Sequence, residues 1–275
     1  MRPASPCFAG RGPAPTCQRP GSVTTDSILS QHLTGPPGLV SSKRSAGFTL
    51  IEVALVLVIV GLLIGGILKG WELIQNSRMR TLAATTTSVQ GAFFAFSDRY
   101  GRVAGDWNAV DAGNAIGETV NGGGNDNQRL DTPPGDPWTE SNAFWEQLAK
   151  ARFVNGGFQG TAATEPTSSN NLTPMNVFGQ PIIIGRTPDF VGASGPRRHI
   201  LVGRGVPVAM LRELDIKLDD GNPGSGKVRA TLDDGALTVF GGAGLWGGAE
   251  SACVNGTPIW DVNAGAGDCN GLLLF

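Results

Sequence analysis

The sequence has few of the residues on which most catalytic and metal-binding sites are built. Its 275 residues include only two histidines, His32 and His199, and four cysteines. The cysteines form no Cys-x-x-Cys motif and have no histidine at zinc-site spacing, and no serine-centred nucleophile motif is present. A structural zinc site and a Ser-His-Asp triad are therefore not expected, and the sequence points away from an enzyme.

Charged residues make up only 16% of the chain, and their two signs are unevenly distributed. Residues 1–47 hold five Lys/Arg and one acidic residue, whereas residues 48–275 hold 16 Lys/Arg and 22 Asp/Glu. A basic lead before an apolar run predicts that the N-terminal side stays in the cytoplasm. The acidic remainder argues against nucleic acid as the main partner, because phosphate attraction needs a basic surface.

The four cysteines fall into two pairs. Cys7 and Cys17 lie in the first segment, and Cys253 and Cys269 lie 16 positions apart near the C-terminus. In an exported domain the second pair favours a disulfide, which in the chain-entropy model contributes roughly 3 kcal/mol of stability. Two free thiols are the alternative.

Residues 1–47 are rich in Pro, Gly, Ser and Thr and have no sustained hydrophobic periodicity. This composition predicts a leader peptide or an unstructured segment over residues 1–47. Because 47 residues is long for a leader, a translation start downstream of Met1 is an open alternative.

Residues 48–70 are predicted to form a membrane-spanning helix. Phe48–Leu68 carries a single charge, on Glu52, and a helix of about 20 residues crosses the hydrocarbon core. Lys69 and Trp71 follow at positions typical of interfacial anchors. Three small residues would let another helix approach closely: Gly61, Gly65 and Gly66. An ordinary signal anchor with incidental glycines is the alternative.

The helical pattern continues through residues 71–100, which are predicted to be the amphipathic half of the same helix. Residues spaced alternately four and three apart form one stripe: Leu82, Thr86, Val89, Phe93, Phe96 and Tyr100. No proline interrupts residues 48–100, and Gly101 is expected to end the helix. Such a stripe must pack on something. A membrane helix followed by a separate short helix is the alternative.

Residues 101–275 are predicted to be a globular head with a C-terminal disulfide region. A Gly/Asn/Asp-rich connector over residues 101–137 precedes a helix at 137–152, with Asp136 as its cap. Further on, a helix is expected at Val206–Leu218 and strands at four places: Pro181–Arg186, His199–Arg204, Lys227–Leu232 and Ala236–Phe240. The last two strands flank Asp-Asp-Gly, a hairpin signal, and the terminal "LLLF" is a further strand candidate. The predicted fold class is α+β, a long N-terminal helix packed on an antiparallel sheet.

The stretch "GFTLIE" at residues 47–52, between two cations and an uninterrupted apolar helix, resembles the processing site of type IV pilins and type II secretion pseudopilins. The resemblance extends over much of residues 41–232. It includes "DRYG" at Asp98–Gly101, "AFWEQLAKARF" from Ala143 and "LDIKLDDGNPGSGKVRA" from Leu214. Two features depart from the family: Lys69 stands where many pilins have a helix-kinking proline, and the leader is longer than usual.

The resemblance implies a set of roles for named residues. A prepilin peptidase would cut between Gly47 and Phe48, Phe48 would be N-methylated, and Glu52 would be needed for assembly. The family's terminal disulfide matches Cys253 and Cys269. Implied partners are the prepilin peptidase, other pilin subunits, an assembly ATPase with its inner-membrane platform, and membrane lipid. The protein would be anchored in the bacterial inner membrane with its head in the periplasm, and then enter a filament.

Physical chemistry gives a reason for Glu52. A lone carboxylate in hydrocarbon costs about 2.5–3.5 kcal/mol on insertion scales and needs a partner. Cleavage after Gly47 creates an amine at Phe48, and that cation can pair with Glu52 of a neighbouring subunit or of its own chain. The interpretation is that Glu52 sets the register between stacked helices. A location at the cytoplasmic interface without a role in assembly is the alternative.

Asp215, Asp219 and Asp220 are candidate calcium ligands, because Ca²⁺ takes oxygen ligands. They resemble the C-terminal calcium site of major pseudopilins. Their spacing matches no EF-hand loop, and a helix-ending turn, which is the favoured interpretation, explains the acids equally well. No other cofactor is expected.

Two questions stay open. The first is whether the protein belongs to a type IV pilus, as a major or a minor subunit, or to a secretion pseudopilus, because the sequence features do not distinguish these. The second is whether the protein is a filament subunit at all. The alternative function is a periplasmic ligand-binding or enzymatic domain that a signal-anchor helix tethers to the membrane.

Overall fold

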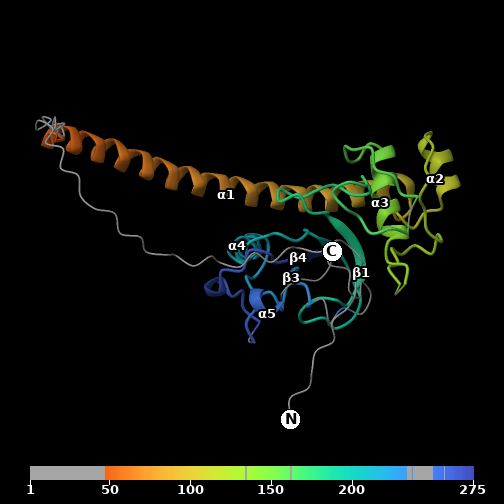
Figure 1. Ribbon diagram of the computed structural model, residues 1–275. Helices are drawn as coiled ribbons and strands as arrows, with labels where there is room; N and C mark the ends of the chain where they lie inside the picture. The colour runs from red at the N-terminus through yellow and green to blue at the C-terminus, as the bar shows by residue number, and fades with distance from the viewer. Residues whose placement is uncertain (1–46, 134, 162, 234–236, 238–249, 257) are drawn as a thin grey trace, which may run out of the picture. The chain divides into compact units, whose positions relative to one another are not determined.

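The computed structural model describes residues 47–133, 135–161, 163–233, 237, 250–256 and 258–275 (Figure 1). The chain divides into two units, residues 1–53 and 54–275. The predicted leader lies outside the described residues apart from Gly47.

Helix α1 (Leu50–Tyr100) is continuous over 51 residues, as the uninterrupted pattern predicted. It ends at Gly101, whose backbone φ of 64° lies in the left-handed region and whose N–H donates to the carbonyl of Ser97. The buried residues all lie in its second half and include most of the predicted stripe: Met79, Leu82, Thr86, Val89, Ala92, Phe93 and Phe96. The alternative of two separate helices is therefore wrong.

The head has short helices and one small sheet. The helices are α2 (Ala109–Ile116), α3 (Thr139–Lys150), α4 (Val208–Leu218), α5 (Glu250–Cys253) and the 3₁₀ helix η2 (Val262–Ala264). The strands are β1 (Ile183–Thr187), β2 (Arg197–Leu201), β3 (Val228–Ala230) and β4 (Gly271–Leu274). A long N-terminal helix followed by a small antiparallel sheet is the α+β, pilin-like arrangement that was predicted.

The sheet is antiparallel with the strand order β1-β2-β4-β3. The C-terminal strand β4 lies between β2 and β3, with Leu273 opposite Ile200 on one side and Val228 on the other. The hairpin prediction gave β3 the neighbouring segment Ala236–Phe240 as partner. That segment lies outside the described residues except Leu237, and the strand that pairs with β3 is β4.

The second half of α1 packs on two hydrophobic clusters of the head (Figure 1). Near its end, Phe93 and Phe96 pack with α3 and the sheet. About three to five turns earlier, Met79 and Leu82 pack with α4 and the disulfide region. The guanidinium of Arg198 lies 4.4 Å from the Phe93 ring centroid, and Phe275 packs edge-on against Phe93. Both hydrophobic clusters of the head therefore include residues of α1.

Several predicted boundaries were wrong. The connector over residues 101–137 contains α2, whose N-cap Asn108 accepts the N–H of Asp111 and whose C-cap Gly117 has a φ of 83°. The Asn and Gly that suggested a loop are the caps of a short helix. The predicted strand His199–Arg204 begins two residues earlier and leaves the sheet after Leu201, because Gly203 turns the chain with a φ of 86°.

Helix α3 also begins later than predicted, at Thr139. Asp136 is not its N-cap, but its carboxylate accepts the backbone N–H and the hydroxyl of Thr139. The acid therefore satisfies a donor of the first turn from two positions before the N-cap residue, Trp138.

Candidate functional site

Helix α1 begins with a reciprocal pair of hydrogen bonds between Thr49 and Glu52. The Glu52 carboxylate accepts the backbone N–H of Thr49 at 2.9 Å and its hydroxyl at 2.8 Å. In return the Thr49 hydroxyl oxygen accepts the N–H of Glu52 at 3.3 Å. Thr-x-x-Glu at a helix start is a capping box, which satisfies two N–H groups that have no partner inside the helix.

Sequence reasoning identified Glu52 and missed Thr49. The signal was present, since Thr49 stands three positions before an acid at the start of an apolar run. Gly47 and Phe48 precede the helix, and Phe48 is 85% exposed. The bond between them therefore lies in exposed chain before the helix, beside the capping box.

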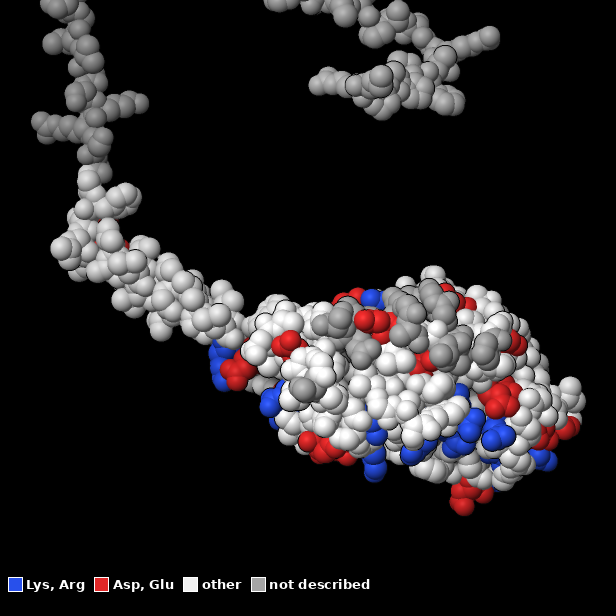
Figure 2. All heavy atoms as spheres, turned by 90° about the horizontal axis from the view of Figure 1, so that it is seen from below, with Lys and Arg blue, Asp and Glu red and all other residues white. Residues whose placement is uncertain are grey.

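The apolar half of α1 is exposed throughout. Every residue from Val53 to Lys69 is exposed, and residues 53–68 carry no charged side chain. Figure 2 shows this part of the helix as almost uniformly white, while blue and red gather on the head. Among the described residues, α1 is the one helix long and apolar enough to span a membrane, a finding that rests on length and composition.

Four glycines interrupt this apolar surface, and no other part of the chain that the structure describes packs against them. A Cβ added at Gly61, Gly65, Gly66 or Gly70 would meet no atom within 4 Å. The backbone is therefore exposed at these positions. Small residues at a helix surface let the backbone of a second helix approach closely.

The second predicted element is the disulfide, and it forms. Cys253 and Cys269 are bonded with a Cα–Cα distance of 5.9 Å, and both side chains are buried. The backbone of Cys269 exchanges hydrogen bonds with Val206, directly before α4. The bond thus joins α5 to the segment that enters β4, the central strand contributed by the C-terminus.

The three candidate calcium ligands lie together at the end of α4 and in the turn that follows it, and one carboxylate oxygen from each lies within 4.8 Å of the others. The buried Asp215 accepts the indole N–H of Trp260 at 2.7 Å and the N–H of Gly221 at 3.1 Å. Asp219 accepts the backbone N–H groups of Lys227 and Val228. The cluster therefore closes the loop between α4 and β3.

The electrostatics of this turn differ from residue to residue. Burial is the main cause that raises the pKa of Asp215 to about 6, and the charges of Asp220 and Asp219 add to it. The hydroxyl of Ser225 and the N–H of Asn222 hold the pKa of the exposed Asp220 below its usual range. These oxygens are ligands that Ca²⁺ accepts, but backbone and side-chain donors already engage all three carboxylates.

The remaining polar candidates are structural. His199 is fully buried in β2, and its Nδ1 lies 2.8 Å from the carbonyl oxygen of Arg197. Burial lowers its pKa to about 4, so the ring is neutral at pH 7. Four tryptophans are also buried in the hydrophobic core of the head: Trp107, Trp138, Trp145 and Trp260. Trp246 lies outside the described residues.

Comparison with known proteins gives one match. No curated protein and no solved structure matches the chain. Residues 42–68 match the family described as the prokaryotic N-terminal methylation motif. The match includes the Gly47–Phe48 bond, the capping box and the exposed apolar half of α1, and it ends before the head begins. The chain therefore carries, at its N-terminal helix, the signature of the type IV pilins and pseudopilins.

Proposed function

We propose that the protein is a structural subunit that is cleaved after Gly47, methylated at Phe48 and polymerised through α1 into a type IV pilus or a secretion pseudopilus. One observation carries the proposal: the methylation motif stands at the start of a helix whose first half is bare and apolar and whose second half is built into a folded head. Such a helix provides a membrane anchor before assembly and a packing surface after it.

Glu52 has two partners in this scheme at different stages. In the precursor, its carboxylate is satisfied by Thr49, as the capping box shows. Cleavage converts the Phe48 amide nitrogen into an amine, the only new cation at this end of the chain. A carboxylate in hydrocarbon is costly, and a nearby ammonium of a neighbouring subunit offsets that cost. Head-to-tail contacts that do not close then generate a helical filament.

The partners and the location follow from the same scheme. The precursor would sit in the inner membrane with its N-terminus in the cytoplasm and its head in the periplasm. A prepilin peptidase would act on the accessible Gly47–Phe48 bond. An assembly ATPase with its membrane platform would then move subunits from lipid into the filament. No role for nucleic acid as the main partner is proposed.

The decisive experiment compares two glutamates of α1. Glu52→Gln removes the charge at the capping box, whereas Glu72→Gln removes the charge of an exposed residue paired with Lys69 at 2.8 Å. Both variants should insert into the inner membrane. Incorporation into filaments, measured in sheared fractions by immunoblot, should fall at least tenfold for Glu52→Gln alone. Equal incorporation of the two variants would contradict the role of Glu52.

Processing is tested on the product itself. Mass spectrometry of the filament fraction should show an N-terminal peptide that starts at methylated Phe48. A peptide that still contains residues before position 48 would overturn the proposal as a whole.

For Asp215, Asp219 and Asp220 we propose turn closure in preference to calcium binding. Because backbone donors already occupy these carboxylates, Ca²⁺ should leave the Tm of the full-length protein in detergent unchanged relative to EDTA. Asp219→Ala should lower Tm in both conditions. A rise of Tm with Ca²⁺ that Asp219→Ala abolishes would show a metal site instead.

A further inference from the structure

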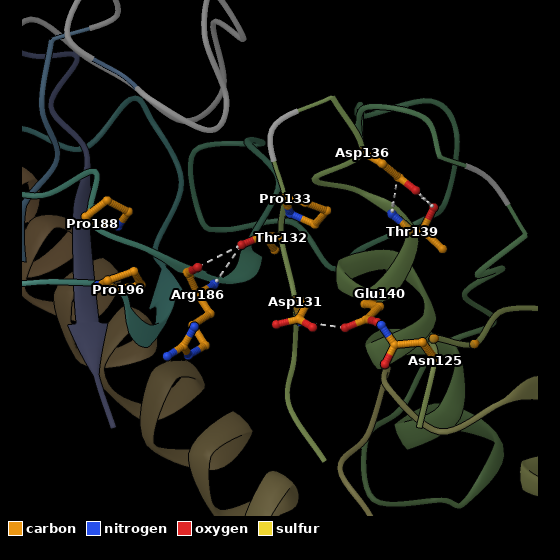
Figure 3. A pocket seen from close by; sticks show the side chains of 12 residues that line it. Asn125, Asp131, Thr132, Pro133, Asp136, Thr139, Glu140, Arg186, Pro188 and Pro196 are labelled. Atoms are coloured by element: carbon orange, nitrogen blue, oxygen red, sulfur yellow. Dashed lines mark hydrogen bonds between the residues drawn. The ribbon is translucent and has the colours of Figure 1, made fainter. Parts of the chain in front are cut away.

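A cavity lined by both charged and apolar residues lies in the head. It has a volume of about 500 Å³ and is bounded by the loop at residues 123–133, the start of α3 and the end of β1 (Figure 3). Its polar wall is formed by Asp131, Asp136, Glu140 and Arg186. Three prolines form rigid apolar parts of the lining: Pro133, Pro188 and Pro196.

Glu140 is the unusual member of this wall. Its side chain is only 6% exposed, and its carboxylate accepts the backbone N–H of Asp131 at 2.5 Å. Among the residues that the structure describes, no cation pairs with it. The backbone is close as well, since a Cβ at Gly124 would lie 2.4 Å from the carboxylate oxygen. A nearly buried carboxylate without a counter-ion is costly, so the site favours a cation from outside.

The electrostatics agree with this geometry. Burial is the main cause that raises the pKa of Glu140 to about 7. The negative charges of Asp106 and Asp131 raise it further, while backbone hydrogen bonds from Asp131 and Asn125 oppose them. Both charged groups that shift the pKa of Glu140, Asp106 and Asp131, are therefore acidic.

Arg186 supplies the opposite charge on the same cavity. Its backbone is fixed by Thr132, whose hydroxyl exchanges hydrogen bonds with the N–H and the carbonyl of Arg186 (Figure 3). Its guanidinium makes no ion pair within the described part of the chain. A planar guanidinium is suited to hold a carboxylate through two parallel hydrogen bonds.

We propose that this cavity binds a small zwitterionic ligand of the amino-acid class, with its ammonium group at Glu140 and Asp131 and its carboxylate at Arg186. The volume of about 500 Å³ lies within the range of small-molecule sites and accommodates an amino acid or a short peptide. The excess of carboxylates over guanidinium makes a ligand with more than one ammonium group the better fit. L-lysine is therefore the first probe.

The proposal sets the direction of the pH dependence. Below pH 7 Glu140 is protonated and gives an ammonium group no counter-charge; above pH 7 it is ionised. Binding of the ammonium releases a proton at low pH, so affinity should rise as pH increases. Between pH 5.5 and pH 8 we expect the Kd for L-lysine to fall at least tenfold.

The experiment is calorimetric titration of the full-length protein in detergent micelles with L-lysine, putrescine or acetate. L-lysine should bind saturably. Glu140→Gln should weaken its binding at least tenfold, whereas Arg186→Gln should weaken L-lysine at least tenfold and leave putrescine unchanged. Asp98→Asn and Arg80→Gln are matched controls, because both residues are exposed on α1 and remote from the lining. Both controls should bind like the unsubstituted protein.

Four results would overturn the proposal. These are absence of saturable L-lysine binding, unchanged binding by Glu140→Gln, loss of putrescine binding in step with L-lysine in Arg186→Gln, and a Kd that does not change with pH. The pH dependence of the Kd is measured on the unsubstituted protein, so this test remains valid even if a variant fails to fold. Filament incorporation does not enter any of these readouts, and the inference stands or falls independently of the proposed function.

Discussion

The two halves of α1 belong to one continuous helix and have opposite surroundings. Leu57, in the first half, is 65% exposed, whereas Phe96, in the second, is fully buried between Tyr100, Trp107 and Phe153. The first half is apolar on every side and the second only along one stripe. A helix that is apolar all round is completed by lipid or by other helices, and one with a stripe is completed by its own domain.

In the proposed function, folding and assembly therefore use separate parts of one helix. Under that proposal, the head can reach its final structure while the first half lies in the membrane, because no buried residue of α1 precedes Met79. Changes in the second half should therefore act on stability, and changes in the first half on membrane insertion and polymerisation.

The largest expected effect comes from the core of the second half. Phe96→Ala should lower the free energy of unfolding by about 3–5 kcal/mol, because it leaves a cavity in a fully buried aromatic cluster. Leu57→Ala is the matched control and should change it by less than about 0.5 kcal/mol. Urea unfolding of the full-length proteins in detergent, followed by tryptophan fluorescence, measures both. Similar losses in the two variants would contradict the division.

Removal of the disulfide should have the next largest effect on the free energy of unfolding. This effect too is confined to the head, since α1 contains no cysteine. Cys253→Ser with Cys269→Ser should cost roughly 3 kcal/mol by the chain-entropy estimate for a loop of this size. The control replaces Cys7 and Cys17, which belong to the predicted leader. An unfolding midpoint unaffected by loss of the Cys253–Cys269 bond would show that β4 is held without it.

Acid should also affect the two halves of α1 differently. Residues 53–68 have no titratable side chain, so the pH dependence of the unfolding free energy should come from the head. Burial lowers the pKa of His199 from 6.5 to about 4, so between these values the unfolded chain binds a proton that the folded head does not. Stability from His199 is complete above pH 6.5 and is lost as pH falls toward 4, by up to about 3 kcal/mol.

The check compares the unsubstituted protein with His199→Gln at pH 7, 5.5 and 4.5. Although the variant is less stable throughout, the pH dependence of its unfolding free energy should be flatter than that of the unsubstituted protein. Two parallel curves would show that His199 is not the group responsible.

The smallest effect is expected at the capping box. Thr49→Val keeps the size of the side chain and removes the hydroxyl that bonds Glu52, at a cost of about 1 kcal/mol at the helix start. The head should keep its Tm, since Thr49 is remote from any buried residue of α1. Filament incorporation should fall less than for Glu52→Gln; a drop in Tm would contradict the separation of the two halves.

Local features of the sequence were sufficient for much of this structure. The extent of α1 followed from an apolar run, a stripe of alternating spacing and one glycine, Gly101, because a helix is stabilised by neighbours within four residues. Helix α2 was missed because its caps, Asn108 and Gly117, are the same residue types that make loops. Of the site, Glu52 was found by its rarity in an apolar run, and Thr49 was overlooked.

The sequence by itself determined the helix, its two kinds of surface, the cysteine pair and the cleavage motif, all of which depend on residues close together in the chain. Only the tertiary structure decided that β4 pairs with both β2 and β3, and that Glu140 and Arg186 line one cavity. The physical reason is that strand pairing and the burial of a charge depend on contacts between distant segments. Many such pairings satisfy the same hydrophobic pattern, and packing of the whole head selects one.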